Sequence, residues 1–164
     1  MYMPSHEQRA IHLLSRSAYG RLAASRRAMP FVVAARHIVA DGHLMLRMHK
    51  GHGYHEAVIG SVVAYGADNV ATTAPGAGQW AVQVIGTGEA VRPTDEQITR
   101  FGPGPGTVDG APFDPVYVRL TPQFVTTHSA DDGLERDFAR LEQRERSAGS
   151  IPGPRPSPES PGAH

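Results

Sequence analysis

The chain has 164 residues, of which 40% are hydrophobic and 20% are charged, and it contains no cysteine. This length fits one domain, and the missing cysteines exclude disulfides, thiolate nucleophiles and cysteine-ligated metal sites. Sixteen Lys and Arg residues balance sixteen Asp and Glu residues, so no net field favours nucleic acid or an anionic membrane as a partner. No apolar run fits a signal peptide or a membrane span, so we expect a cytoplasmic protein.

Residues 1–24 are predicted to form a helix. Ser5 and Gln8 have the spacing of a capping box, in which each side chain satisfies a backbone N–H of the first turn. Apolar residues then follow at steps of three or four, as expected for one buried helix face: Ile11, Leu14, Ala18 and Leu22. We expect Gly20 to end or bend this helix.

Residues 29–126 are predicted to be mainly strands. Phe31–Val39 is rich in branched residues, and Asp41-Gly42 is a hairpin signal before Leu44–Leu46. Three further segments complete the pattern: the apolar run Val58–Tyr65, the alternating segment Trp80–Val91, and the alternating segment Val116–Thr121. Gly86 and Gly88 suggest a bulge or a sharp bend. Closely spaced strands with little helix between them favour an antiparallel barrel or sandwich.

Helices and irregular segments are predicted at the borders of the strand region. Thr94 and Gln97 form a second capping box, which opens a short helix ending near Phe101. Residues 102–115 are rich in Gly and Pro and are expected to form a long loop. We divide the chain into a barrel domain with its N-terminal helix (1–128), a C-terminal helix (129–147) and a disordered Pro-rich tail (148–164).

The order of these signals resembles a known family. Tyr19-Gly20-Arg21-Leu22-Ala23 is followed by a Pro30-led strand, then by Leu-Met-Leu-Arg-Met-His-Lys-Gly (44–51), Gly-Ser-Val-Val-Ala-Tyr (60–65) and Gln-Trp-Ala-Val-Gln-Val-Ile-Gly-Thr-Gly (79–88). Over about residues 7–126 this pattern is similar to the FMN-binding split-barrel proteins that include pyridoxamine-phosphate oxidases and nitroimidazole-resistance-like flavoproteins.

The resemblance implies a mainly β fold, a six-stranded antiparallel split β-barrel with peripheral helices. It also implies a homodimer with FMN bound in grooves at the dimer interface. A six-stranded barrel is too narrow to enclose a flavin, so a shared groove is consistent with the size of the cofactor.

The same resemblance indicates candidate cofactor-binding residues on two strands. Arg47 lies where the family has an arginine next to a phosphate-binding hydroxyl, and a guanidinium can hold phosphate oxygens bidentately. Met48 stands where Thr or Ser is common, which removes one phosphate hydrogen bond, and Gly53 replaces an expected lysine. Lys50 and His52 are possible substitutes. Arg36 stands where relatives often have Asn and is a candidate for the flavin or its phosphate.

Histidines and the single tryptophan complete the candidate set. His49, His52 and His55 recur every three residues, and His37 and His43 precede them. We interpret these histidines as solvated loop residues, with phosphate or flavin contacts by His49 and His52 as the functional alternative. A metal site is not predicted, because convergent carboxylates are missing. Trp80 is interpreted as a barrel-core anchor, or alternatively as a flavin neighbour.

Two functions from different classes follow. One is a flavin-dependent oxidoreductase acting on a small molecule, in which FMN carries the redox chemistry; a deazaflavin or haem is the alternative cofactor. The other is a non-catalytic flavin- or ligand-binding protein with a degenerate cofactor site, which the residues at positions 48 and 53 would favour. No catalytic acid or base is assigned.

Overall fold

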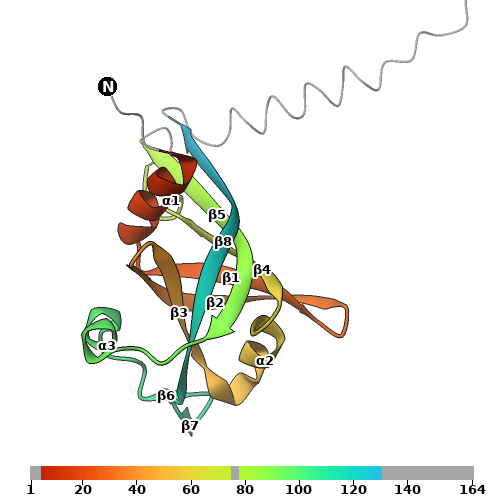
Figure 1. The fold of residues 1–164 in the computed structure, drawn as a ribbon. Coiled ribbons are helices and arrows are strands. Elements are labelled where there is room, and N and C mark those ends of the chain that lie inside the picture. The colour runs from red at the N-terminus through yellow and green to blue at the C-terminus, as the bar shows by residue number, and fades with distance from the viewer. Residues whose placement is uncertain (1–4, 75–77, 131–164) are drawn as a thin grey trace, which may run out of the picture.

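A computed structural model describes residues 5–74 and 78–130. Six antiparallel strands close into a barrel in the order β1-β2-β3-β8-β5-β4 (Figure 1), which confirms the predicted fold class. The barrel strands are β1 (Tyr19–Arg26), β2 (Met29–Ala40), β3 (His43–His49), β4 (Val62–Asp68), β5 (Gln79–Ala90) and β8 (Pro115–Ala130). The remaining elements are α1 (His6–Ser15), η1 (Lys50–His52), α2 (Tyr54–Val58), α3 (Asp95–Phe101), β6 (Thr107–Val108) and β7 (Ala111–Pro112).

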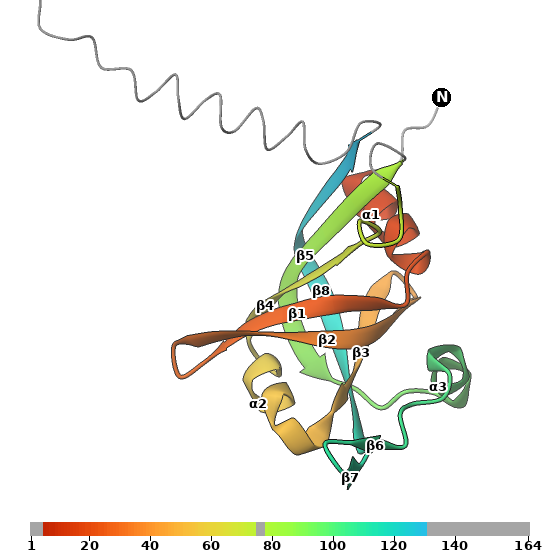
Figure 2. The same cartoon turned by 180° about the vertical axis from the view of Figure 1, so that it is seen from behind.

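Burial along β5 alternates as the sequence predicts for Trp80–Val91. In β5, Trp80, Val82 and Val84 are buried while Gln83 is exposed. Their neighbours on other strands continue one apolar core, for example Leu22, Leu46, Tyr65 and Leu120, each 0% exposed. Helix α1 adds Leu13 and Leu14 to this core. Figures 1 and 2 show α1 at one end of the barrel and α2 at the other.

The predicted helix over residues 1–24 is wrong in its second half. Ser5 caps α1 through the predicted box with Gln8, but the helix ends at Ser15 and β1 begins at Tyr19. Burial in β1 alternates, with Gly20, Leu22 and Ala24 directed inward, so Leu22 belongs to the barrel core and not to a helix face. A Cβ at Gly20 would lie 2.5 Å from the Tyr65 hydroxyl, so the close contact of β1 with Tyr65 requires glycine at this position.

Two other segments differ from the predictions. Val58 ends helix α2, so the apolar run Val58–Tyr65 is a helix end followed by the start of β4. The predicted loop 102–115 contains the short hairpin β6–β7, whose turn residues Asp109 and Gly110 have φ of 51° and 80°. The capping box of Thr94 with Gln97 on α3 is present. The predicted terminal helix and tail fall, from residue 131 onward, outside the described residues.

The two outermost elements leave the barrel wall. Figure 2 shows the β1–β2 hairpin extending beyond the barrel on one side and α3 lying outside the barrel on the other side. Of the α3 residues only Phe101 is buried, packed in a small cluster with Ile38 and Met45. Helix α3 therefore buries little of its surface against the barrel. Hydrogen bonds from Arg36 and Arg47 hold its C-terminal end.

Candidate functional site

The first part of the candidate site is a cavity of about 220 Å³ on the outside of β2 and β3. It brings together five of the seven residues predicted to bind a cofactor: Arg36, Arg47, Met48, His49 and His52. Arg36 and Arg47 are directly opposite each other on paired strands, which places both side chains on the same face of the sheet. Aromatic side chains complete the cavity wall, namely Tyr19, Tyr54 and Phe113.

The two guanidinium groups bind the C-terminal end of α3. Arg36 donates from Nη2 to the Arg100 carbonyl (3.1 Å) and from Nε to the Phe101 carbonyl (3.2 Å). Arg47 donates from Nη1 to the Gly102 carbonyl (2.8 Å). The last carbonyls of a helix lack partners within the helix and carry partial negative charge. Arg36 and Arg47 thus cap three consecutive carbonyls at the end of α3.

Arg47 is also enclosed by aromatic rings. Its guanidinium carbon lies 5.4 Å from the centre of the Phe101 ring and 5.7 Å from that of Phe113, distances at which a cation is attracted to a ring face. Only 7% of Arg47 is exposed. The residue is therefore a buried cation held by rings and a backbone carbonyl, with no carboxylate bound to it among the described residues.

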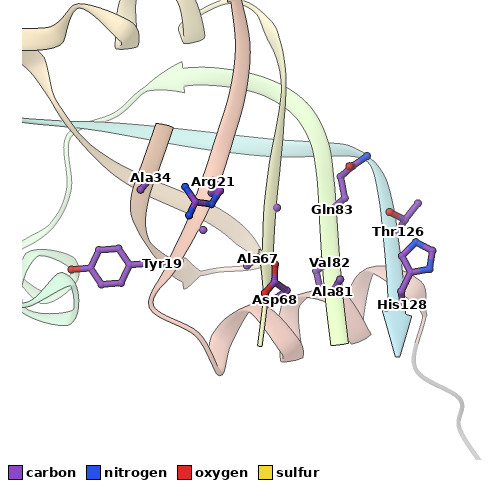
Figure 3. Close-up of a pocket in the computed structure, with 12 residues that line it drawn as sticks. Tyr19, Arg21, Ala34, Ala67, Asp68, Ala81, Val82, Gln83, Thr126 and His128 are labelled. Atoms are coloured by element: carbon purple, nitrogen blue, oxygen red, sulfur yellow. The ribbon is translucent and has the colours of Figure 1, made fainter. Parts of the chain in front are cut away.

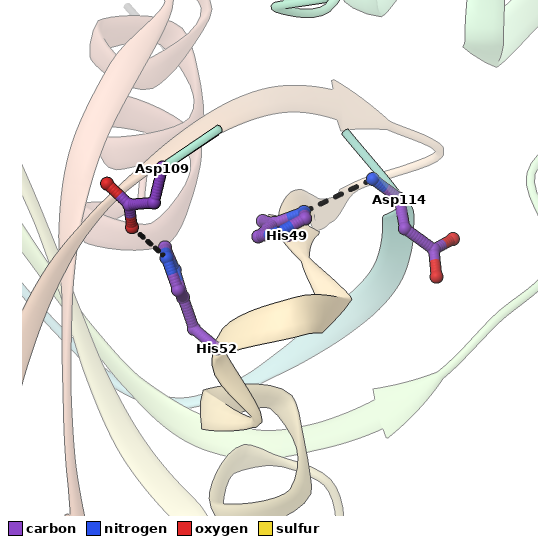
Figure 4. Close-up of polar contacts among 4 residues, drawn as sticks. All are labelled: His49, His52, Asp109 and Asp114. Atoms are coloured by element: carbon purple, nitrogen blue, oxygen red, sulfur yellow. Dashed lines mark hydrogen bonds and ion pairs between the residues drawn. The ribbon is translucent and has the colours of Figure 1, made fainter. Parts of the chain in front are cut away.

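His49 and His52 lie close together, next to Asp109 and Asp114 (Figure 4). The His52 Nε2 atom is 2.7 Å from the Asp109 carboxylate at the hairpin turn. The His49 Nδ1 atom accepts a hydrogen bond from the Asp114 backbone N–H at 3.1 Å, and its ring stacks on Phe113 at 5.6 Å. Both imidazoles are thus engaged with the segment that covers the cavity.

The other predicted residues lie differently. Met48 is 6% exposed and belongs to the barrel core, although it also borders the cavity. Lys50 is exposed in η1, outside the cavity lining. Trp80 is 5% exposed in the barrel core, the position expected for a structural anchor. The structure thus places neither Lys50 nor Trp80 against either part of the candidate site.

A second, larger hollow of about 460 Å³ adjoins the first on the outer surface of the barrel (Figure 3). Tyr19 and Ala34 line both cavities, so the two cavities are neighbours, and together they are called the groove. The larger cavity is lined by small residues and by polar residues. The small residues are Gly20, Ala34, Gly66, Ala67 and Ala81, and the polar ones are Arg21, Asp68, Gln83, Thr126 and His128.

The interpretation of the histidines as solvated loop residues is wrong for His37 and His55. His37 lies on β2 and is 1% exposed, and His55 lies in α2 and is 9% exposed. Residues 50–58 form η1 and α2, separated by Gly53, rather than an open loop. In the part of the chain that is described, three or more His, Asp or Glu residues nowhere gather in a way that could hold a metal ion.

The buried side chain of His37 has a hydrogen-bond partner at each ring nitrogen. Its Nε2 donates to the Leu14 carbonyl at 2.8 Å, and its Nδ1 is 2.5 Å from the Tyr65 hydroxyl. Desolvation by burial lowers the pKa of His37, and the nearby Arg36 charge acts in the same direction. Burial likewise raises the pKa of Tyr65. His37 is therefore a neutral link between α1 and the barrel.

Sequence reasoning missed several residues that build the site. Tyr19 falls in the predicted helix, and both Asp109 and Phe113 fall in the predicted loop 102–115. The turn signal Asp109-Gly110, flanked by residues able to pair, could have indicated the β6–β7 hairpin. The pairing of Asp109 with His52, 57 residues apart in sequence, had no signal in the sequence.

Comparison with known proteins agrees with the fold and identifies its class. Residues 6–129 match the family described as pyridoxamine 5'-phosphate oxidase, and the chain belongs to this family. No curated protein matches the sequence.

Several solved structures share the barrel. An FAD-binding protein from Mycobacterium smegmatis is 20% identical, with a TM-score of 0.57 over 74% of this chain and 93% of that protein. An FAD-binding protein from Mesorhizobium loti is 20% identical, with a TM-score of 0.53 over 74% and 93%. A heme-binding protein from M. smegmatis is 16% identical, with a TM-score of 0.56 over 79% and 59%. At these identities the likeness establishes the fold alone.

The residues present fit a phosphorylated flavin in chemistry. Arg36, Arg47 and the two imidazoles supply cationic or N–H donors suited to a phosphate, and the small-residue wall suits a flat ring. The fit has one restriction: in this conformation α3 and the β6–β7 hairpin bind the same donors.

The helices within the described ranges include none that is long and apolar enough to cross a membrane.

Proposed function

We propose that this chain binds a flavin, FMN, in the groove formed by the two neighbouring cavities, and uses it to oxidise or reduce a small molecule. The groove itself is the observation that supports this most: an arginine- and histidine-lined end continues past Tyr19 into a shallow wall of small residues. A bound flavin would supply hydride or electron transfer, and the protein would supply binding and orientation.

The groove would be completed by a second copy of the chain. Five apolar residues lie side by side across five strands on the outer surface, through the pairs Val32–Ala23, Ala23–Ala64, Ala64–Ile85 and Ile85–Phe124. Val32 is 61% and Phe124 is 58% exposed. Exposed apolar residues joined into one patch indicate an interaction surface, and this stripe directly borders the row Ala34–Arg21–Gly66–Gln83–Thr126 that lines the groove. A homodimer would bury the stripe and enclose the flavin.

The experiment is a visible spectrum of the purified protein before and after addition of FMN. We expect oxidised-flavin bands that stay with the protein on gel filtration and bleach on addition of reduced nicotinamide. Protein that stays colourless and does not quench FMN fluorescence at micromolar concentration would refute the proposal.

The alternative function is a non-catalytic flavin- or ligand-binding protein, and the engagement of Arg36 and Arg47 by α3 favours it. Flavin that binds but is not turned over by any reduced nicotinamide would support this alternative. A deazaflavin or haem would be recognised by which cofactor raises the melting temperature, because a ligand that binds only the folded state stabilises it by RT ln(1 + [L]/Kd).

A further inference from the structure

We propose that the segment of residues 95–114, here called the cover segment, and the anionic end of a ligand compete for the same side chains. The cover segment comprises α3, the Gly-Pro-rich link, the β6–β7 hairpin and the two residues that precede β8, Phe113 and Asp114. This inference rests on the proposed function for the identity of the flavin, but the competition itself concerns any phosphate or diphosphate group.

The contacts of the cover segment support this competition. Its carbonyls at Arg100, Phe101 and Gly102 accept hydrogen bonds from Arg36 and Arg47. Its Asp109 carboxylate pairs with His52, and its Asp114 N–H donates to His49. The four side chains that the sequence indicates for a phosphate, Arg36, Arg47, His49 and His52, are thus the side chains that hold the cover segment.

Four of the five bound groups of the cover segment, three carbonyls and one carboxylate, resemble an anion in their chemistry, whereas the Asp114 N–H is a donor. Carbonyl oxygens at a helix C-terminus carry a partial negative charge, and Asp109 carries a full one. A phosphate offers several oxygens and more charge to the same donors, so it forms stronger charge-assisted hydrogen bonds with guanidinium groups than neutral carbonyls do. Ligand binding would therefore free the carbonyls of α3 and repel the Asp109 carboxylate.

Elsewhere the cover segment has few attachments, among them the hydrogen bond from Arg100 Nη2 to the Val39 carbonyl. Phe101 is the only buried residue of α3, and in the link and hairpin, residues 103–112, most positions are exposed. Segments with few buried apolar contacts open at low free-energy cost. Since the ligand-competent state requires opening, the observed affinity is the intrinsic affinity reduced by the open fraction.

Hydrogen–deuterium exchange measured by mass spectrometry tests the competition on the whole chain. FMN and inorganic pyrophosphate are each expected to increase exchange in peptides covering residues 102–114, while riboflavin, which lacks the phosphate, is not. Unchanged exchange in these peptides with both pyrophosphate at millimolar concentration and FMN would overturn the inference.

A matched pair of glycine variants tests the same point by affinity. An added Cβ at Gly104 would lie 2.9 Å from the Phe113 ring, whereas at Gly106 no atom lies within 4 Å. Gly104→Ala should therefore loosen the cover segment and bind pyrophosphate severalfold more tightly in calorimetry, and Gly106→Ala should bind like the wild type. Equal affinities in all three proteins would contradict the inference.

Failure of the inference and failure of the proposed function give different results. If FMN and riboflavin both bind and exchange in the cover segment does not change, the flavin proposal stands and the competition is wrong. If neither flavin binds but pyrophosphate increases exchange in residues 102–114, the competition stands and the flavin proposal is wrong.

Discussion

His37 connects helix α1 to the interior of the barrel through hydrogen bonds on both ring nitrogens. Nε2 donates to the Leu14 carbonyl, and in the neutral ring Nδ1 accepts the hydroxyl proton of Tyr65. Burial favours the neutral imidazole over the charged one, and in the neutral ring Nδ1 is the acceptor for Tyr65. Protonation of His37 is therefore coupled to unfolding.

The free energy of unfolding should fall as the pH drops below about 6.5, the ordinary pKa of histidine. Since burial lowers the pKa of His37 in the folded state, the unfolded chain binds this proton first, and its contribution to stability is present above that pH and is lost below it. The slope can reach about 1.4 kcal/mol per pH unit for one proton. Urea unfolding followed between pH 8 and 5.5 measures it.

The matching variants are His37→Gln and His12→Gln. The first should lower stability at pH 8, by about 1–3 kcal/mol for a lost buried hydrogen bond, and should flatten the pH dependence. His12 is exposed on α1, so its replacement should keep the wild-type profile. A profile for His37→Gln as steep as that of the wild type would assign the pH dependence to other groups.

Individual residues were predictable only where a family resemblance assigned them a position. Arg36, Arg47, His49 and His52 do gather at one cavity, but the sequence did not reveal that α3 and the β6–β7 hairpin would bind them. Those contacts join residues about 55–65 positions apart. Hydrogen bonds of this kind depend on how the elements pack, which short motifs do not encode.

Elements were predictable where local chemistry determines them. The capping boxes at Ser5 and Thr94 and the Asp41-Gly42 turn each form as expected, because their hydrogen bonds and φ preferences involve only near neighbours. The end of α1 was not predictable in this way. Leu22 continues the helical spacing of the preceding apolar residues, and only barrel closure selects its strand position.

Gly86 illustrates an element-level requirement that the sequence did indicate. The pairing of β5 with β8 shifts between Ile85 and Gly86, so that Gln123 has no partner in the register. This bulge brings the β8 backbone very close: an added Cβ at Gly86 would lie 2.0 Å from the Thr121 carbonyl oxygen. A side chain here cannot be accommodated without moving a strand.

Gly86→Ala should therefore destabilise the barrel by about 1–3 kcal/mol or more, the usual cost of overpacking. Gly66→Ala on β4 is the control, since its added Cβ would meet the Val82 carbonyl oxygen at 3.7 Å, an ordinary contact. Chemical denaturation of both variants measures the difference. Equal stability of the two variants would mean that β8 can shift freely at the bulge.

On the scale of the whole molecule, the closed barrel was anticipated from the order of strand and turn signals, but its outer surface was not. The apolar stripe Val32, Ala23, Ala64, Ile85 and Phe124 takes one residue from each of five strands. Its members extend from Ala23 to Phe124 in the sequence, and only the strand register aligns them. The stripe is therefore a property of the assembled barrel.

If this stripe is where two copies meet, a charge placed on it should separate them. Val32→Lys puts an ammonium group into a surface that would be dry in the dimer, and by symmetry it does so twice. Loss of one buried Val contributes about 1.5–3 kcal/mol, and burying a charge adds to that, so dimerisation should weaken at least tenfold to a hundredfold.

Ile98 on α3 is 44% exposed and is not part of the stripe, so Ile98→Lys is the control that should stay dimeric. Sedimentation equilibrium measures the association, and FMN titration of the same samples should show weaker binding for Val32→Lys alone, because the groove borders the stripe. A wild-type protein that sediments as a monomer at micromolar concentration would contradict the dimer.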